Sequence, residues 1–305
     1  MVFRSHSIMF HAVSPAGSGK QHGVDSEGFH RIVKLLEFEF DVLSARDLIE
    51  SLIVSPSHAG GVAMSFDDGM KCHLEYAAPW LESLGLRGIF FIHTQPLTDG
   101  FDRLVSVKEF IDSEFRDIND YYHEFNYAVD LVKGHGFLVE MNMPVDFLVD
   151  YPFYTEQDKE YRYLRDMVLT DEEFDAVVEK VMSGHRKKRL DYCDKNYWLS
   201  ADDIKELHRR GHMVGLHTHT HPTNLTRLPY DGQLENYRKN KEILEEIIGE
   251  QISIASYPCG RFDQNTHRVM RALGVSVAFG SSMNVPDGNL TVPRQDPAVI
   301  MQRPG

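Results

Sequence analysis

The feature that most constrains the fold is an alternation between short apolar runs and longer amphipathic segments. Seven apolar runs have the composition of buried β-strands, and they lie at residues 7–10, 38–43, 61–66, 88–92, 213–217, 252–257 and 275–279. Strands that alternate with helices predict an α/β fold with a parallel sheet and helical crossovers. Because no glycine-rich phosphate loop is present, we expect a barrel rather than a nucleotide-binding doubly wound sheet.

Several helix ends can be located from capping patterns. Ser26 is expected to cap the helix that follows the first strand. Ser200 and Asp203 have the spacing of a capping box, and Gly249 is expected to end the helix that begins near residue 234.

Composition and charge limit the classes of function. The chain has 305 residues, 42% of them hydrophobic, and a formal net charge of −14, which argues against general binding to nucleic acid or to anionic membranes. There is no apolar run of membrane-spanning length and no signal-peptide pattern, so we expect a cytoplasmic protein. Cys72, Cys193 and Cys259 show no paired spacing, which favours reduced thiols.

Residues 97–196 interrupt the alternation with an aromatic, charged and largely helical stretch. We therefore expect a barrel over residues 1–96 and 197–305 and an inserted subdomain between them. Because the insertion leaves from the end of the fourth strand, it is expected to act as a lid or specificity element. The alternative is that its aromatic residues only form a small core of their own. The basic run at residues 185–189 either binds an acidic group or is a solvated helix end.

Two adjacent acids follow the third apolar run, in Ser65-Phe66-Asp67-Asp68-Gly69. Such a pair can divide its work, with one carboxylate binding a metal while the other moves protons. Asp-Asp-Gly is also ordinary turn sequence, so this motif alone does not establish catalysis.

Three histidines at alternate positions follow the run at residues 213–217. His217 and His221 are four residues apart and face the same way if the chain turns helically there. Together with a carboxylate they form a two-His, one-carboxylate metal site. Alternation points His219 to the other side, so we expect it to support the site rather than to bind the metal.

In α/β barrels the reacting groups gather at the C-terminal ends of the strands. The candidate residues share this position in the sequence, since each lies at or just beyond the end of a predicted strand: His11, Asp67, Asp68, His93, His217 and Cys259.

Three ordered motifs resemble those of the NodB-type polysaccharide deacetylases, carbohydrate esterase family four. They are Ser65-Phe66-Asp67-Asp68-Gly69, the segment from His217 to Pro222, and Ala255-Ser256-Tyr257-Pro258-Cys259-Gly260. The resemblance covers about two-thirds of the chain. It implies a distorted (β/α)7 barrel and a divalent metal, usually zinc, with cobalt, nickel or iron as alternatives. It also implies hydrolysis of an N- or O-acetyl group on a sugar.

The resemblance and the chemistry together assign roles to these residues. Asp68, His217 and His221 would bind the metal, and Asp67 would be the general base for a metal-bound water. The backbone N–H of Cys259 would help to stabilise the negative charge on the acetyl oxygen.

The sequence departs from the common family pattern in its general acid. No Leu-x-His motif follows Cys259, whereas Phe10-His11 matches the N-terminal histidine motif of a family subset. We therefore expect His11 to be the general acid, with His93 as the alternative.

A second departure concerns the arginine that pairs with the catalytic aspartate. Ser256 occupies the place where the third motif often has this arginine. Arg294 resembles a late arginine of the same subset and is expected to orient Asp67, with Arg261 as the competing candidate.

These features predict a metal-dependent deacetylase. Its expected substrate is an acetylated sugar, an oligosaccharide, or a nucleotide- or lipid-linked sugar of the kind used in lipopolysaccharide biosynthesis. The sequence does not specify the sugar, the bond or the oligomeric state. Two alternatives remain: a catalytically inactive NodB-like protein that binds sugar or acts as a scaffold, and a non-haem iron enzyme.

Overall fold

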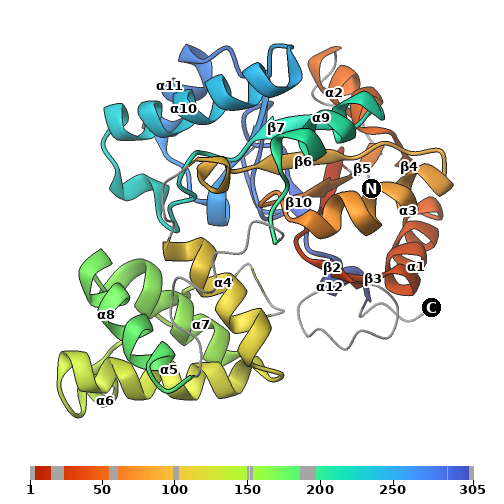
Figure 1. Cartoon of the computed structure of the whole chain (residues 1–305). Coiled ribbons are helices and arrows are strands. Elements are labelled where there is room, and N and C mark those ends of the chain that lie inside the picture. The colour runs from red at the N-terminus through yellow and green to blue at the C-terminus, as the bar shows by residue number, and fades with distance from the viewer. Residues whose placement is uncertain are drawn as a thin grey trace. The chain divides into compact units, whose positions relative to one another are not determined.

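The structure is a computed structural model that describes residues 4–14, 24–54, 61–98, 103–149, 151, 154–185, 197–286 and 288–301. Cys193 and residues 186–189 of the basic run lie outside these residues. The chain divides into two compact units (Figure 1). Unit 1 comprises Met1–Asp99 and Lys195–Gly305, and unit 2 comprises Gly100–Asp194.

Unit 1 contains a parallel sheet with the strand order β10-β1-β5-β6-β7-β8-β9. Its strands are β1 (His6–Phe10), β4 (Asp41–Val42), β5 (Gly61–Phe66), β6 (Ile89–Ile92), β7 (Met213–Leu216), β8 (Ile254–Ser256), β9 (Val277–Phe279) and β10 (Arg294–Gln295). A parallel bridge between Phe279 and Val292 links β9 to the residues before β10, so the sheet is nearly closed. The expected distorted barrel is confirmed.

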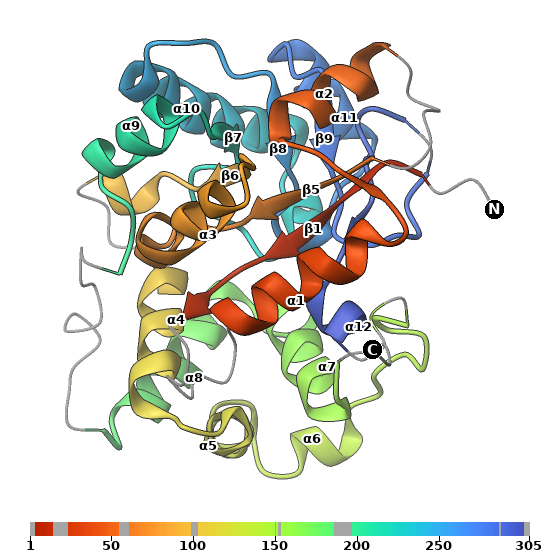
Figure 2. The same cartoon turned by 90° about the vertical axis from the view of Figure 1, so that its right-hand side faces the viewer.

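The distortion arises at β5. Strand β4 pairs with Gly61 and Val62 at its start, whereas β6 pairs with Ser65 and Phe66 at its end. Two short strands therefore share one edge of β5. Strand β1 pairs along the other edge, and β1 and β5 lie side by side in Figure 2. A small separate sheet joins β2 (Val13–Ser14) to β3 (Val24–Asp25).

Helices pack around the outside of this sheet. In unit 1 the structure describes α1 (Ser26–Glu37), α2 (Ala45–Val54), α3 (Ala78–Ser83), α9 (Ala201–Arg209), α10 (Tyr230–Ile248), α11 (Gln264–Ala272) and α12 (Pro297–Met301). The capping box of Ser200 and Asp203 is confirmed, and Gly249 ends α10 in the left-handed conformation. The expectation for Ser26 was wrong by one residue. The Asp25 carboxylate caps α1 by accepting the Gly28 N–H, and Ser26 is the first helical residue.

Seven strands lie where the apolar runs predicted them, but their lengths differ. The run at 38–43 yields only Asp41–Val42, because Phe38 is the C-cap of α1 and the chain needs several residues to turn into the sheet. The structure adds β10, β2 and β3, each two residues long and too short to show periodicity.

The end of β5 is fixed by aromatic packing. Phe10, Phe66 and Phe90 are register partners on adjacent strands, so they share one face of the sheet. Their rings stack with centroid distances of 5.1 Å for Phe10–Phe66 and 5.0 Å for Phe66–Phe90. All three side chains are buried. Since side chains alternate along a strand, Phe66 anchors the helix side while Asp67 is directed to the other face.

Unit 2 is helical in its described residues. It contains α4 (Arg103–Glu114), α5 (Ile118–Lys133), α6 (Phe137–Glu140), α7 (Glu156–Tyr163) and α8 (Asp171–Met182). Its own core includes Phe110, Tyr121, Phe125, Tyr161 and Phe174. Thr155 and Thr170 each form a capping box, at the starts of α7 and α8. None of the helices in the described part of the chain has the length and apolar character needed to cross a membrane.

We expect Phe66→Ala to lower the free energy of unfolding of unit 1 by about 3–5 kcal/mol, because it removes the centre of the aromatic stack and leaves a cavity. Urea unfolding followed by circular dichroism measures this loss. Phe38→Ala is the control, since that ring is 86% exposed and its removal should cost little. Equal losses in the two variants would contradict the role of the stack.

Candidate metal centre and active site

A tight turn after β5 positions Asp67 and Asp68. The Asp67 N–H donates to the Phe10 carbonyl at 2.9 Å, which continues the β1–β5 ladder by one bond. Asp68 and Gly69 then adopt positive φ angles of 81° and 76°. A Cβ atom at Gly69 would lie 2.8 Å from the Ile92 side chain, so glycine is required there for both space and conformation.

The return of the chain from unit 2 supports this turn. Met70 and Trp198 form an antiparallel bridge, and the Leu199 N–H donates to the Gly69 carbonyl at 2.9 Å. The first motif is therefore held from both sides, by β1 and by residues 197–199.

The histidine segment after β7 is not helical, so it lacks the helical turn that would make His217 and His221 face the same way. Thr218 and His221 instead have φ angles of 65° and 49°, and two left-handed residues bend the chain back on itself. The Thr218 hydroxyl accepts the His221 N–H at 3.1 Å, which closes the turn. His217 and His221 still converge, with their ring centroids 4.9 Å apart.

Helix α10 holds this irregular segment through two asparagines. Asn240 Oδ1 accepts the His217 N–H at 3.0 Å, while its Nδ2 donates to the Ile92 carbonyl at 2.9 Å. Asn236 Oδ1 accepts from the backbone of His219 at 2.7 Å and of Thr220 at 3.0 Å. Our sequence analysis missed both residues. Their signal is a spacing of four that places amides on the sheet-facing side of a helix.

The three expected ligands lie together. Asp68 Oδ1 is 3.3 Å from His217 Nε2 and 3.2 Å from His221 Nε2, and one ligand atom from each residue lies within 4.8 Å of the others. Two ligands bonded at about 2.0–2.1 Å to one tetrahedral ion are separated by about 3.3 Å. The donor set of one carboxylate and two imidazoles therefore fits a divalent metal. Among the described residues, this is the one such group of potential ligands.

Asp67 lies beside this cluster in a separate ion pair. Arg294 binds it through two parallel bonds, Nη1 to Oδ1 at 2.6 Å and Nη2 to Oδ2 at 2.7 Å, and both side chains are buried. The Arg294 Nε also donates to the Gly280 carbonyl. Burial acts to raise the pKa of Asp67, but the Arg294 charge and its hydrogen bonds hold it below its usual value. Asp67 is thus an anion throughout the neutral range.

Of the two arginines considered for Asp67, the structure pairs Arg294 with it. Arg261 is the C-cap of the turn at Pro258–Gly260 that follows β8. Within this turn Cys259 adopts a left-handed conformation, with φ 51° and ψ 19°. The Gly260 N–H donates to the Tyr257 carbonyl at 2.9 Å, so the third motif is also a compact turn at a strand end.

The two candidate acids have different surroundings. His11 follows β1 and is exposed, and its backbone carbonyl lies 3.0 Å from His73 Nε2. His93 is buried, with its ring centroid 4.9 Å from that of Trp198 and 5.5 Å from that of His221. Of the two histidines, His11 is the one open to solvent.

His219 has the supporting place expected for it. Its Nδ1 lies 2.9 Å from the Thr94 hydroxyl, and the side chain is buried. Burial, with a smaller effect of Lys239, lowers the pKa of His219 to about 4. The ring is therefore neutral at physiological pH and links the ends of β6 and β7.

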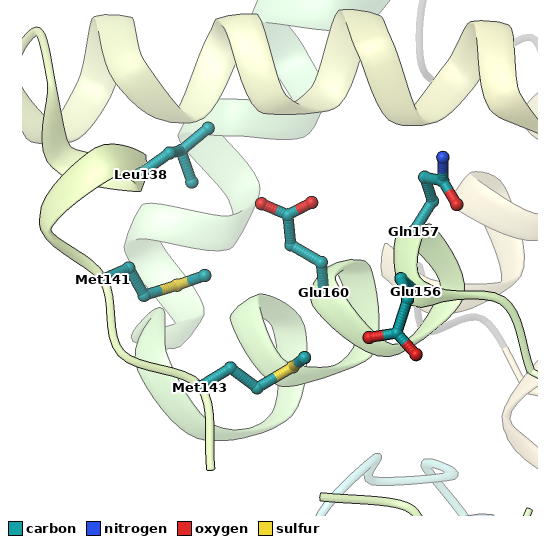
Figure 3. Close-up of a pocket in the computed structure, with 6 residues that line it drawn as sticks. All are labelled: Leu138, Met141, Met143, Glu156, Gln157 and Glu160. Carbon is teal, nitrogen blue, oxygen red and sulfur yellow. The ribbon is translucent and has the colours of Figure 1, made fainter. Parts of the chain in front are cut away.

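A pocket of about 350 Å³ lies within unit 2 (Figure 3). One side carries Leu138, Met141 and Met143, and the other carries polar side chains of α7. None of the site residues expected from the sequence lines it, so it is separate from the cluster at the strand ends.

Comparisons with known proteins agree with the motifs. The polysaccharide deacetylase family matches residues 55–278. The fold resembles three solved structures at 14–15% identity. One is the Streptococcus pyogenes deacetylase PplD in complex with acetate, with 14% identity and a TM-score of 0.56 over 99% of this chain and 98% of that one. Another is IcaB from Ammonifex degensii, with 15% identity and a TM-score of 0.58 over 98% of this chain and 95% of that one. The third is a de-N-acetylase from Aggregatibacter actinomycetemcomitans, with 14% identity and a TM-score of 0.54 over 96% of this chain and 95% of that one. A search of curated proteins found no match.

The family match contains the three motifs but neither terminal feature. Asp67, Asp68 and the histidine pair lie within it, whereas His11 precedes it and Arg294 follows it. Membership of the subset with an N-terminal histidine therefore stays a prediction. The chain itself belongs to the polysaccharide deacetylase family.

Proposed function

We propose that this protein is a metal-dependent hydrolase that removes an N- or O-acetyl group from a sugar. The observation that carries this proposal is the placement of two chemically different carboxylates side by side. Asp68 contacts two imidazoles, as a metal ligand would, whereas its neighbour Asp67 is held by an arginine. Hydrolysis needs both carboxylates, because one must hold the metal that activates the water and the other must accept the proton that the water loses.

The metal would be bound by Asp68, His217 and His221, with zinc as the preferred ion and cobalt, nickel or iron as alternatives. When bound, it would acidify a water molecule and polarise the acetyl carbonyl.

Asp67 would act as the general base. Its two oxygens are fixed by the Arg294 guanidinium, so the carboxylate is ionised and its orientation is set before substrate arrives. It would take a proton from the attacking water, while the backbone N–H of Cys259 would stabilise the negative charge on the acetyl oxygen.

His11 would donate a proton to the departing amine or alkoxide, since neither leaves readily as an anion. The charge of His11 makes a small contribution to lowering the pKa of Asp67, which supports a position of His11 near this base.

The proposed substrate is an acetylated sugar residue. The titles of two similar structures name acetate as a ligand and de-N-acetylation as an activity, which supports an acetyl group as the part removed. We further propose that the sugar is linked to a nucleotide or lipid carrier, and that unit 2 selects it. Chain connectivity supports this role, since β6 leads into unit 2 through His93 and the chain returns through Trp198.

Metal analysis of anaerobically purified protein, followed by assays for acetate release and oxygen uptake, tests the proposal. Acetate release that depends on added metal is the expected result. Oxygen uptake without acetate release would indicate a non-haem iron enzyme, and sugar binding without either would indicate an inactive relative.

We expect Asp67→Asn to reduce kcat by at least about 10²–10⁴-fold while metal still binds, because the base is lost and the ligands remain. His217→Ala should lose both metal and activity. Metal content by elemental analysis and acetate release measure the two effects. An active Asp67→Asn variant would refute the assignment of the base.

His11→Ala should slow hydrolysis most for substrates with poor leaving groups, because only those need a proton donor. An N-acetyl sugar and 4-nitrophenyl acetate give the comparison, since nitrophenolate leaves without protonation. If both rates match those of the unchanged protein, the proton donor must be sought at His93.

Arg294→Met should shift the acid limb of the kcat/KM profile to higher pH. The charge and the bonds of Arg294 lower the pKa of Asp67, and burial alone would raise it. In the unchanged protein the pair stabilises the fold above about pH 4, and this contribution is lost as the pH falls through the lower pKa of folded Asp67. Arg294→Lys keeps the charge and should shift the limb less. An unmoved acid limb in Arg294→Met would contradict this role.

A further inference from the structure

Ser256 is a fully buried hydroxyl in direct contact with an expected metal ligand. It is the last residue of β8, whose register pairs Ala255 with Leu216 of β7. The residue after Leu216 is His217, so the two strand ends bring Ser256 and His217 together. Ser256 Oγ lies 2.6 Å from His217 Nδ1, and the two side chains are 0% and 1% exposed.

The contact bears on which ring nitrogen of His217 carries the proton. His217 Nε2 faces Asp68, and it can bind a metal only when it carries no proton. The proton of the neutral ring must then be on Nδ1, where Ser256 Oγ is placed to accept it. The backbone of His217 is fixed separately by Asn240. His217 Nδ1 also lies 3.4 Å from the Ser256 backbone carbonyl, so the hydroxyl at 2.6 Å is the nearer of the two acceptors that Ser256 offers to the ring.

Ser256 is itself held in place. Its carbonyl accepts the Tyr237 O–H from α10 at 2.9 Å, and it pairs with Phe279 in the β8–β9 ladder. Its hydroxyl is therefore carried by a rigid strand end. The Arg294 guanidinium reaches Asp67 from another strand, β10.

We propose that Ser256 is a positioning residue that fixes the ring orientation and the tautomer of His217, so that Nε2 is available to a divalent metal. The inference rests on the proposed function for the role of His217 as a ligand. Partners of this kind typically change metal affinity by about 10- to 100-fold. Ser256, which stands where the third motif often has an arginine, thus orients a metal ligand, whereas Arg294 orients the base.

Ser256→Ala tests the proposal without any substrate. Zn²⁺ binding is measured by competition with a chromogenic chelator, and Co²⁺ binding by its visible absorption. We expect the dissociation constant to rise about 10- to 100-fold. In Zn²⁺-loaded protein with ¹⁵N-labelled histidine, the Nδ1–H proton of His217 should exchange with water faster in the variant than in the unchanged protein. Affinity within about twofold of the unchanged protein and an unaltered exchange rate would overturn the proposal.

Ser7→Ala is the matched control. Ser7 is also a fully buried strand serine, but its hydroxyl bonds Ser65, at 3.0 Å. A loss of metal affinity in both variants would show a general effect of buried serines and would also refute the proposal. If Ser256→Ala fails to fold, Ser256→Cys keeps the size with a weaker acceptor, and unchanged affinity in that variant would count against it equally. If Zn²⁺ affinity falls as expected but the unchanged protein releases no acetate, the proposed function fails while the role of Ser256 stands.

Discussion

The buried ion pair between Asp67 and Arg294 is the interaction on which the site depends. Each charge would be costly to bury alone, so the two strand ends that carry them must meet in the folded chain. Asp67 follows β5 and Arg294 begins β10, with β1 between these strands. The pair therefore links the first motif to the last strand of the sheet, and it leaves Asp68 as the carboxylate that faces the two imidazoles.

Much of this arrangement follows from local sequence. Buried parallel strands read as apolar runs, so β1, β5, β6, β7, β8 and β9 could be placed from composition alone. Strand β10 could not, because Arg294 and Gln295 are polar and gain their place only from pairing with β1. A strand of two residues is too short to show a pattern. The partner that stabilises the buried Arg294 is Asp67, which lies 227 positions earlier in the chain.

The site was predictable where residue type alone carries the chemistry. A carboxylate and two histidines at strand ends indicated a metal site, and the family match covers all three. The conformation of the histidine segment could not be predicted, because its backbone N–H groups bond the side chains of Asn236 and Asn240 in the helix that follows it. The spacing of four between Asn236 and Asn240 places them on one helix face, but it does not identify the backbone groups that their amides bind.

Four of the five non-glycine residues with positive φ in the described chain lie in the three motif turns: Asp68, Thr218, His221 and Cys259. Such backbone conformations cost on the order of 1–2 kcal/mol each. Selection for heat resistance alone would favour relaxing these turns, whereas selection for chemistry would preserve them. Thermal stability and activity therefore place opposite demands on this edge of the barrel. Substitutions meant to raise stability are better placed at the opposite edge.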